Sequence, residues 1–213
     1  LIVSGIWPPD VGGPASHGPE VAAWLRDHGH SVEAVVTADV EPPPAPYPVR
    51  WVARSLPPGL RHARALALVA ARARRADVIY STGMFGRSSL GALLARTPIV
   101  LKITADPAFE RARRRGLVSG HVTDFQGGGG GPVASTLRRL RDAALRRASH
   151  VVCPSEFMRD LVVSWGVAAE RVDVLPNPAP RAQDATTVDV GRHPVLAFAG
   201  RLTAQKDLGV ALA

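Results

Sequence analysis

Short apolar segments alternate with longer helical patterns along the chain, and this alternation limits the fold more than any other feature. The predicted strands are continuous apolar runs, as in PIVLKIT, which is typical of parallel strands buried on both faces. We therefore predict an α/β fold, in which helices cover both faces of a parallel sheet. The predicted strands occupy 1–6, 31–37, 49–53, 77–81, 98–104, 150–154 and 171–176. The predicted helices occupy 16–28, 60–75, 86–96, 133–148 and 155–165, and a last strand and partial helix lie within 194–213.

Composition narrows the class of partner. Lys and Arg number 26 against 18 Asp and Glu, so the net charge is +8 and an anionic partner is expected. Nucleic acid is disfavoured, because aromatic residues make up only 5% of the chain and form no stacking platform. The single cysteine, Cys153, excludes an intrachain disulfide and suits a reducing compartment, so we predict a cytoplasmic protein. No apolar run reaches the ~18 residues of a membrane-spanning helix. The seven histidines show no ligand spacing, so no metal site is expected.

The loop WPPDVGGPASHG after the first strand is the first candidate site. In parallel sheets, ligands bind in the loops after the carboxyl ends of the strands. Gly12 and Gly13 leave a bare backbone at the entrance to a helix, where amide hydrogens and the helix dipole favour an anion. Trp7 follows the first strand and is a candidate for stacking on a sugar. The alternative is a Pro/Gly turn that only redirects the chain, since neither the dinucleotide-binding glycine motif nor the Walker motif is present.

The segment GRLTAQK near the end of the chain is the second candidate. Gly200 allows a tight turn after a strand, and the guanidinium fork of Arg201 matches a phosphate. Lys206 could reach the same anion as a point charge, so the pair suits a diphosphate. The alternative is two solvated basic residues, which a chain rich in arginine often carries.

These segments also resemble a known family. GRLTAQKDLGVALA resembles the G-R-L-x-x-x-K-[GD] signature that opens the second domain of glycosyltransferase family 4, the retaining enzymes of GT-B fold. WPPDVGG resembles the glycine loop of that family's first domain. CPSEFMRDLVVSWGV and RVDVLPNPA resemble the segment that leads out of the first domain. Together the matches cover most of the chain in the right order.

The resemblance implies two Rossmann-like domains that face each other across a cleft. We predict an acceptor-side domain at 1–176, a linker at 177–193 and the incomplete start of the donor-binding domain at 194–213. A nucleotide-diphosphate sugar would donate a hexosyl group, with retention, to the hydroxyl of a glycan, a lipid-linked or a small-molecule acceptor. Arg201 and Lys206 would stabilise the donor diphosphate without any metal or other cofactor.

The resemblance also marks Gly12, Gly13 and Gly200 as backbone that approaches the donor. KITADPAFE and the later DFQ resemble a subgroup of the family, so Asp106, Glu110 and Gln126 are candidate polar residues of the cleft. The alternative for Asp106 is a cap on the following turn, since Asp before Pro often has that role. The surrounding segment 105–132, including five glycines at 127–131, is predicted to be irregular, either as a loop over the cleft mouth or as a passive insertion.

Two further alternatives concern activity and location. A sugar-nucleotide epimerase of the same build, or a non-catalytic nucleotide-sugar binding domain, would carry the same segments. The chain looks truncated at both ends, so we expect residues 1–213 alone to be inactive.

The arginine-rich helix 133–148 has an apolar stripe of Val133, Leu137, Leu140 and Ala144, with its arginines mostly off that stripe. We favour a core-facing helix with a solvated basic face, and peripheral contact with an anionic membrane is the alternative.

Overall fold

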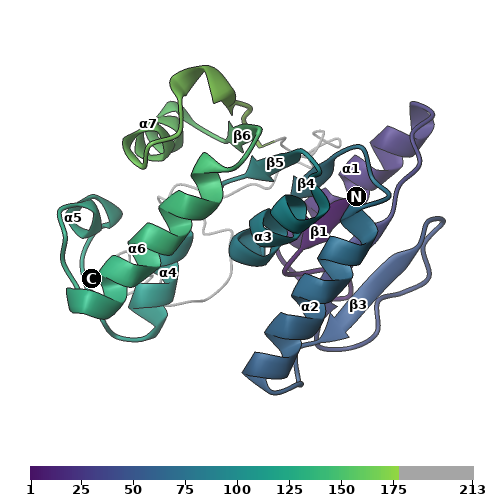
Figure 1. Cartoon of the computed structure of the whole chain (residues 1–213), viewed down its shortest axis with the longest axis horizontal. Coiled ribbons are helices and arrows are strands. Elements are labelled where there is room, and N and C mark those ends of the chain that lie inside the picture. The colour runs from purple at the N-terminus through teal and green to yellow at the C-terminus, as the bar shows by residue number, and fades with distance from the viewer. Residues whose placement is uncertain (178–213) are drawn as a thin grey trace, which may run out of the picture. The chain divides into compact units, whose positions relative to one another are not determined.

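The computed structural model describes residues 1–177, and these residues contain one parallel sheet of seven strands in the order β3-β2-β1-β4-β5-β6-β7 (Figure 1). The sheet confirms the predicted α/β class. The chain adds strands to one side of β1 first and then to the other side, so the strand order reverses between β1 and β4. The strands are β1 (Ile2–Ser4), β2 (Ala34–Ala38), β3 (Val49–Ala53), β4 (Ile79–Ser81), β5 (Ile99–Lys102), β6 (His150–Cys153) and β7 (Val172–Val174).

Helices cover the two faces of the sheet unequally. One core cluster joins side chains of β1, β2 and β4–β7 to helices α2, α3, α6 and α7, while a smaller cluster joins β1 and β2 to α1. The helices are α1 (Gly13–Asp27), α2 (Pro58–Ala73), α3 (Phe85–Ala95), α4 (Pro107–Arg114), α5 (Val122–Gln126), α6 (Gly131–Arg146) and α7 (Glu156–Ser164), and a 3-10 turn, η1 (Ala169–Arg171), precedes β7. No helix among residues 1–177 is long and apolar enough to cross a membrane.

The prediction that residues 105–132 are irregular is wrong, because this segment contains α4 and α5. Asp106 starts α4: its carboxylate accepts hydrogen bonds from the amides of Ala108 and Phe109, and Pro107 opens the first turn. The segment is then held by a third apolar cluster, of Ala108, Ala112, Phe125, Ala134 and Leu137. The sequence did not predict α4, because the buried face of this helix consists of alanines set among arginines.

The predicted apolar stripe of the helix after the glycine run is half wrong. Leu137 and Ala144 are buried, but Val133 and Leu140 are 49% and 61% exposed. The buried face of α6 instead carries Arg141, which is 6% exposed and lies one helical turn from Leu137. An arginine tolerates this position only because polar partners from α4, α5 and the end of α7 surround it, as described below.

Residues Leu1–Asn177 form one compact unit. The proposed domain limits stay predictions, since residues 178–193 of the linker and the strand and helix expected within 194–213 lie outside the described residues.

Candidate functional site

The candidate site lies where the strand order reverses, at the carboxyl ends of β1 and β4. Two glycines make this junction tight: a Cβ on Gly83 would lie 2.8 Å from the backbone nitrogen of Gly5. Hydroxyl groups bind the loops together, with Thr82 Oγ1 donating to Ser4 Oγ at 3.1 Å and Thr37 Oγ1 donating to the Gly5 carbonyl at 3.0 Å. In open parallel sheets this reversal is where ligands bind, outside the carboxyl ends of the strands.

The loop from β1 to α1 is anchored by one arginine. Arg54, which follows β3, forms an ion pair with Asp10 of the loop, and its other terminal nitrogen lies 2.6 Å from Asp39 Oδ2. Asp10 also accepts a hydrogen bond from the backbone nitrogen of Trp7 at 3.4 Å. The loop therefore has a defined path from Trp7 to the first turn of α1.

Gly12 and Gly13 lie at the start of α1, as the sequence predicted. Gly12 is the N-cap residue, with no side-chain cap, and the first turn of α1 contains no acidic residue. Gly13 is exposed, and a Cβ there would meet nothing within 4 Å. An anion could thus approach the amide end of this 15-residue helix without competing with an acidic side chain of its first turn.

The expectation that Trp7 stacks on a sugar is not supported by its position. Its side chain is 2% exposed and belongs to the core cluster under α1. Gly18 of α1 makes room for the ring, since a Cβ there would lie only 2.4 Å from Trp7 Cζ3. Trp7 acts in this structure as a core residue that fixes α1 against β1 and β2, because burial of so large an apolar ring is favourable.

Asp106 and Gln126, two predicted cleft residues, lie together, and their side chains form hydrogen bonds with each other and with neighbouring protein groups. Asp106 is 2% exposed, and its Oδ2 accepts from Arg141 Nη1 at 2.6 Å and from Gln126 Nε2 at 3.0 Å. Gln126 Oε1 accepts from Trp165 Nε1 at 2.8 Å, and the Arg141 guanidinium lies over the Trp165 ring at 3.9 Å from its centroid. The capping role for Asp106 is therefore confirmed, and its carboxylate has little capacity left for a substrate. We call Asp106, Gln126, Arg141 and Trp165 the buried polar cluster.

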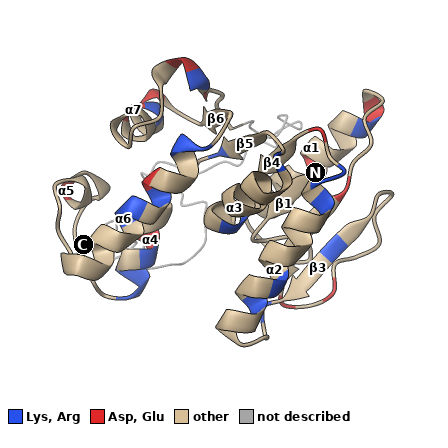
Figure 2. Ribbon diagram, viewed as in Figure 1, with Lys and Arg blue, Asp and Glu red and all other residues tan. Residues whose placement is uncertain are grey.

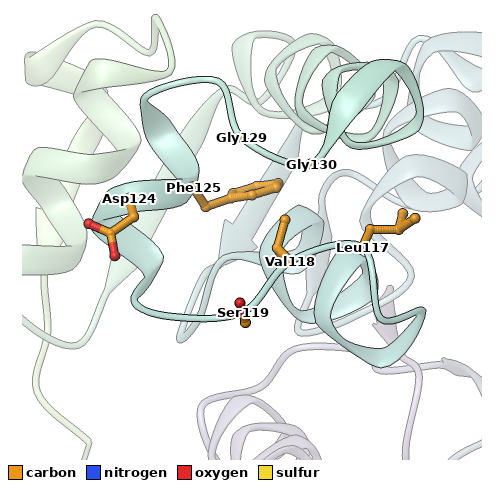
Figure 3. Close-up of a pocket in the computed structure, with 7 residues that line it drawn as sticks. All are labelled: Leu117, Val118, Ser119, Asp124, Phe125, Gly129 and Gly130. Carbon is orange, nitrogen blue, oxygen red and sulfur yellow. The ribbon is translucent and has the colours of Figure 1, made fainter.

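Glu110 is exposed on α4 and forms no ion pair within residues 1–177, so its assignment to the cleft stays a prediction. Gly130 is the N-cap residue of α6 and Gly131 begins that helix, while a role of the glycine run as a loop over the cleft mouth or as a passive insertion stays a prediction. Gly129 and Gly130 line a cavity of about 270 Å³ together with Leu117, Val118, Ser119, Asp124 and Phe125, and Figure 3 shows the Phe125 ring directed across it while Asp124 points away.

A second polar group, which sequence reasoning missed, joins α1 to the carboxyl ends of β4 and β5. His17 Nε2 is 2.8 Å from the Tyr80 hydroxyl, and Lys102 at the end of β5 is 4% exposed. Burial raises the pKa of Tyr80 to about 12 and lowers the pKa of Lys102, and burial together with the charge of Lys102 lowers the pKa of His17. Lys102, a lysine that ends an apolar strand, is a signal for this group in the sequence.

Gly200, Arg201 and Lys206, the predicted diphosphate residues, lie outside the described residues. Within residues 1–177, no group of three or more His, Cys, Asp or Glu side chains could hold a metal ion. The expectation of a metal-free reaction stays a prediction.

Cys153 is buried, as expected of a structural thiol, and burial raises its pKa to about 11.

A seven-stranded parallel sheet with a glycine loop at its strand reversal defines a Rossmann-like domain of the kind found in GT-B proteins. The model of the glycosyl transferase 4-like domain matches residues 12–178, which is most of the chain. The chain belongs to this family, and the resemblance noted in the sequence is thereby confirmed.

Solved structures show the same fold at low sequence identity. Anabaena Alr3699/HepE in complex with UDP and glucose is 19% identical, with a TM-score of 0.55, and the match covers 83% of this chain and 44% of that one. The apo form of the lipopolysaccharide outer core galactosyltransferase WaaB is 10% identical, with a TM-score of 0.57 over 99% of this chain and 56% of that one. UDP-GlcNAc 2-epimerase from Methanocaldococcus jannaschii is 14% identical, with a TM-score of 0.53 over 81% and 44%. This chain spans about half the length of these proteins, and a search of curated proteins found no match.

Proposed function

We propose that this chain is the acceptor-side part of a retaining glycosyltransferase, which moves a hexosyl group from a nucleotide-diphosphate sugar to the hydroxyl of an acceptor. The observation that carries the proposal is the match of the family model across residues 12–178. The fold neighbours add support, because one of them is a complex with UDP and glucose and another is a galactosyltransferase.

In this proposal the described residues contribute a binding surface rather than a general base. The exposed amide end of α1, at Gly12 and Gly13, faces the donor's phosphates or the transferred sugar. Arg201, Lys206 and the Gly200 turn stabilise the negative charge that develops on the leaving diphosphate. Since these cations stabilise the leaving group, we propose that no metal is required.

The test is transfer by the full-length protein with UDP-glucose as the first donor and a panel of glycan and lipid-linked acceptors. We expect release of UDP and a product that keeps the anomeric configuration of the donor, as read by NMR. Arg201→Ala should lower kcat by about 10²–10³-fold, the range for losing one group that stabilises a developing oxyanion. An inverted product, or full activity in Arg201→Ala, would contradict the proposal. We further propose that residues 1–213 alone give no turnover, and transfer by that chain would contradict this point.

A sugar-nucleotide epimerase is the second candidate, favoured by the shared fold with the 2-epimerase of Methanocaldococcus jannaschii. An epimerase would interconvert UDP-GlcNAc and its C2 epimer with no acceptor present. The same NMR experiment without an acceptor separates the two functions. A non-catalytic binding domain would bind the nucleotide sugar and leave it unchanged in both experiments. We also propose a location in the cytoplasm, with peripheral contact of α6 to an anionic membrane as the alternative to a solvated basic face.

A further inference from the structure

Four basic side chains from three helices gather at the same edge of the sheet as the glycine loop. Arg61 and His62 lie in the first turn and a half of α2, Arg87 lies in the first turn of α3, and Arg111 lies in the middle of α4. Each helix follows the carboxyl end of its strand, β3, β4 or β5, so the early turns of α2 and α3 and the short helix α4 lie near the edge at which ligands bind. Figure 2 shows basic segments on all three helices.

Hydrogen bonds hold three of the four side chains of this basic cluster, while Arg111 is exposed and lies close enough for its charge to act on His62 and Arg87. Arg87 Nη1 lies 2.6 Å from His62 Nδ1, and since a guanidinium can only donate, Nδ1 must be the acceptor. His62 is then neutral, and its Nε2 carries a hydrogen that can be donated to a ligand. Arg61 Nη1 donates to the Arg54 carbonyl at 2.7 Å, which fixes this side chain beside the start of α2.

The cluster lacks an anionic partner within residues 1–177. The acidic groups in ion pairs there contact Arg50, Arg54, Arg72, Arg141, Arg159 and His150, and none contacts a member of the basic cluster. The charges of Arg61 and Arg111 both act on Arg87 and on His62, so the four groups share one region of positive potential. Burial and these neighbouring charges lower the pKa of Arg87 and of His62.

Such an arrangement is unfavourable on its own and becomes favourable when an anion binds. Like charges that are partly removed from water repel one another, and a bound anion reverses the sign of that interaction. Three guanidinium groups supply paired donors in the planar geometry that matches phosphate oxygens, and the imidazole supplies one more donor. A single carboxylate would engage only one of these forks, whereas a phosphate offers oxygens to several at once.

We propose that Arg61, His62, Arg87 and Arg111 form a phosphate-binding subsite, and that it holds the phosphate or diphosphate group of the acceptor. The assignment to an acceptor rests on the proposed transferase function, whereas the phosphate site itself does not. The subsite belongs to the first domain, whereas Arg201 and Lys206, which serve the donor in the proposed function, lie outside the described residues. It accounts for the placement of a half-buried arginine, Arg87 of α3, against His62 of α2 without an acidic partner in the described residues.

The binding test uses the chain of residues 1–213 with inorganic phosphate and pyrophosphate as probes, measured by calorimetry at constant ionic strength. We expect saturable binding that weakens about tenfold in Arg87→Gln and in Arg111→Gln, as for the loss of one charge-assisted contact. Arg139→Gln is the matched control, because Arg139 is exposed on α6 and its replacement removes the same charge. Arg111 is exposed, so its variant should fold even if Arg87→Gln does not.

If Arg139→Gln weakens phosphate binding as much as Arg111→Gln does, net charge alone attracts the phosphate and the proposed site is overturned. The site is also overturned if phosphate, pyrophosphate and phosphate-bearing vesicles all fail to show saturable binding. Vesicles of phosphatidylcholine with or without phosphatidic acid distinguish the source of the phosphate. Binding that requires phosphatidic acid and is lost in Arg111→Gln supports a lipid headgroup, while binding to pyrophosphate in solution supports a soluble phosphorylated acceptor.

The acceptor assignment has its own readout in the full-length protein. Arg111→Gln should raise the KM for a phosphorylated acceptor about tenfold and leave the KM for the nucleotide sugar unchanged. If phosphate binding depends on Arg111 but no transfer occurs with any donor, the proposed function fails and the phosphate site stands. If transfer to phosphorylated acceptors is unaffected by Arg111→Gln, the acceptor assignment fails while the transferase function stands.

Discussion

Replacement of Arg141 by methionine tests the role of the buried polar cluster in holding α4, α5 and α6 together. The Arg141 and Asp106 side chains are 3% and 0% exposed, so neither charge can turn to solvent when its partner is lost. Methionine keeps the unbranched stem and the helix propensity of arginine but removes the guanidinium. The variant therefore leaves the Asp106 carboxylate buried without its cation.

The expected loss follows from the contacts that remain. Removing one partner of a buried ion pair costs about 3–5 kcal/mol. Asp106 still accepts from the amides of Ala108 and Phe109 and from Gln126 Nε2, so the low end of that range, about 3 kcal/mol, applies to the ion pair. Loss of the guanidinium from the face of Trp165 adds on the order of 1 kcal/mol. We expect Arg141→Met to lower the free energy of unfolding by about 4 kcal/mol.

A second substitution should partly reverse this loss. Asp106→Asn keeps a side-chain oxygen to cap α4 and removes the buried charge. In Asp106→Asn/Arg141→Met neither charge remains, so we expect a total loss of only about 1–2 kcal/mol, that of neutral hydrogen bonds. The double variant should thus be more stable than Arg141→Met alone, by about 2 kcal/mol or more.

Urea unfolding of the chain, followed by far-UV circular dichroism, measures all members of this cycle. The dependence of the unfolding free energy on urea should be the same in each variant, since a change would indicate altered compactness. Arg141→Lys serves as a milder variant that keeps the charge and loses the fork. If the effects of the two substitutions simply add to within about 0.5 kcal/mol, the two side chains are not coupled and the reasoning is refuted.

Three further predictions concern separate parts of the chain. Gly130→Ala should lower stability by about 1–3 kcal/mol, because φ is +89° and a Cβ would lie 2.6 Å from a neighbouring side chain, while Gly129→Ala, with open space at Cβ, should cost less than half as much in the same urea assay. Because burial lowers the pKa of His17, stability should fall as pH drops below about 6.5, where the unfolded chain gains the proton first, and His17→Gln should flatten this part of the stability profile. Because burial raises the pKa of the Cys153 thiol to about 11, its reaction with a disulfide reagent at pH 7.5 should be slow until urea unfolds the chain, and rapid labelling of the native chain would contradict its burial.

The sheet could be predicted from the sequence because a strand buried on both faces needs an uninterrupted apolar run. The strand predicted at 31–37 overlaps β2, all five residues of which are buried. Helix α4 could not be found in the same way, because only Ala108 and Ala112 on it are buried, and alanine at four-residue spacing among arginines gives a weak apolar period. Its stability comes from packing on residues far away in the sequence, Phe125 and Leu137 among them.

The site was harder to predict than the fold, because polar residues have the same appearance in sequence whether they face a ligand or the framework. One signal for Arg141 was present: it lies four residues after Leu137 and four before Leu145, both buried on α6, so its position belonged to the core face. An arginine on a core face requires a buried acid. Asp106 could have been identified as that acid only by knowing that α4 and α6 pack together, which is a property of the fold.

Asp106 is buried and Gln126 is half-buried, and this changes which mutations in the first domain are expected to affect substrate binding. Their side-chain oxygens already accept hydrogen bonds from Arg141, Trp165 and backbone amides. A substrate that used them would have to displace these hydrogen bonds, and the exchange would gain little. The groups with unused donors are instead the amide end of α1 and the basic cluster, and both favour anions. In the full-length protein, Asp106→Asn should therefore alter stability with little change in KM, whereas Arg111→Gln should alter the acceptor KM with little change in stability.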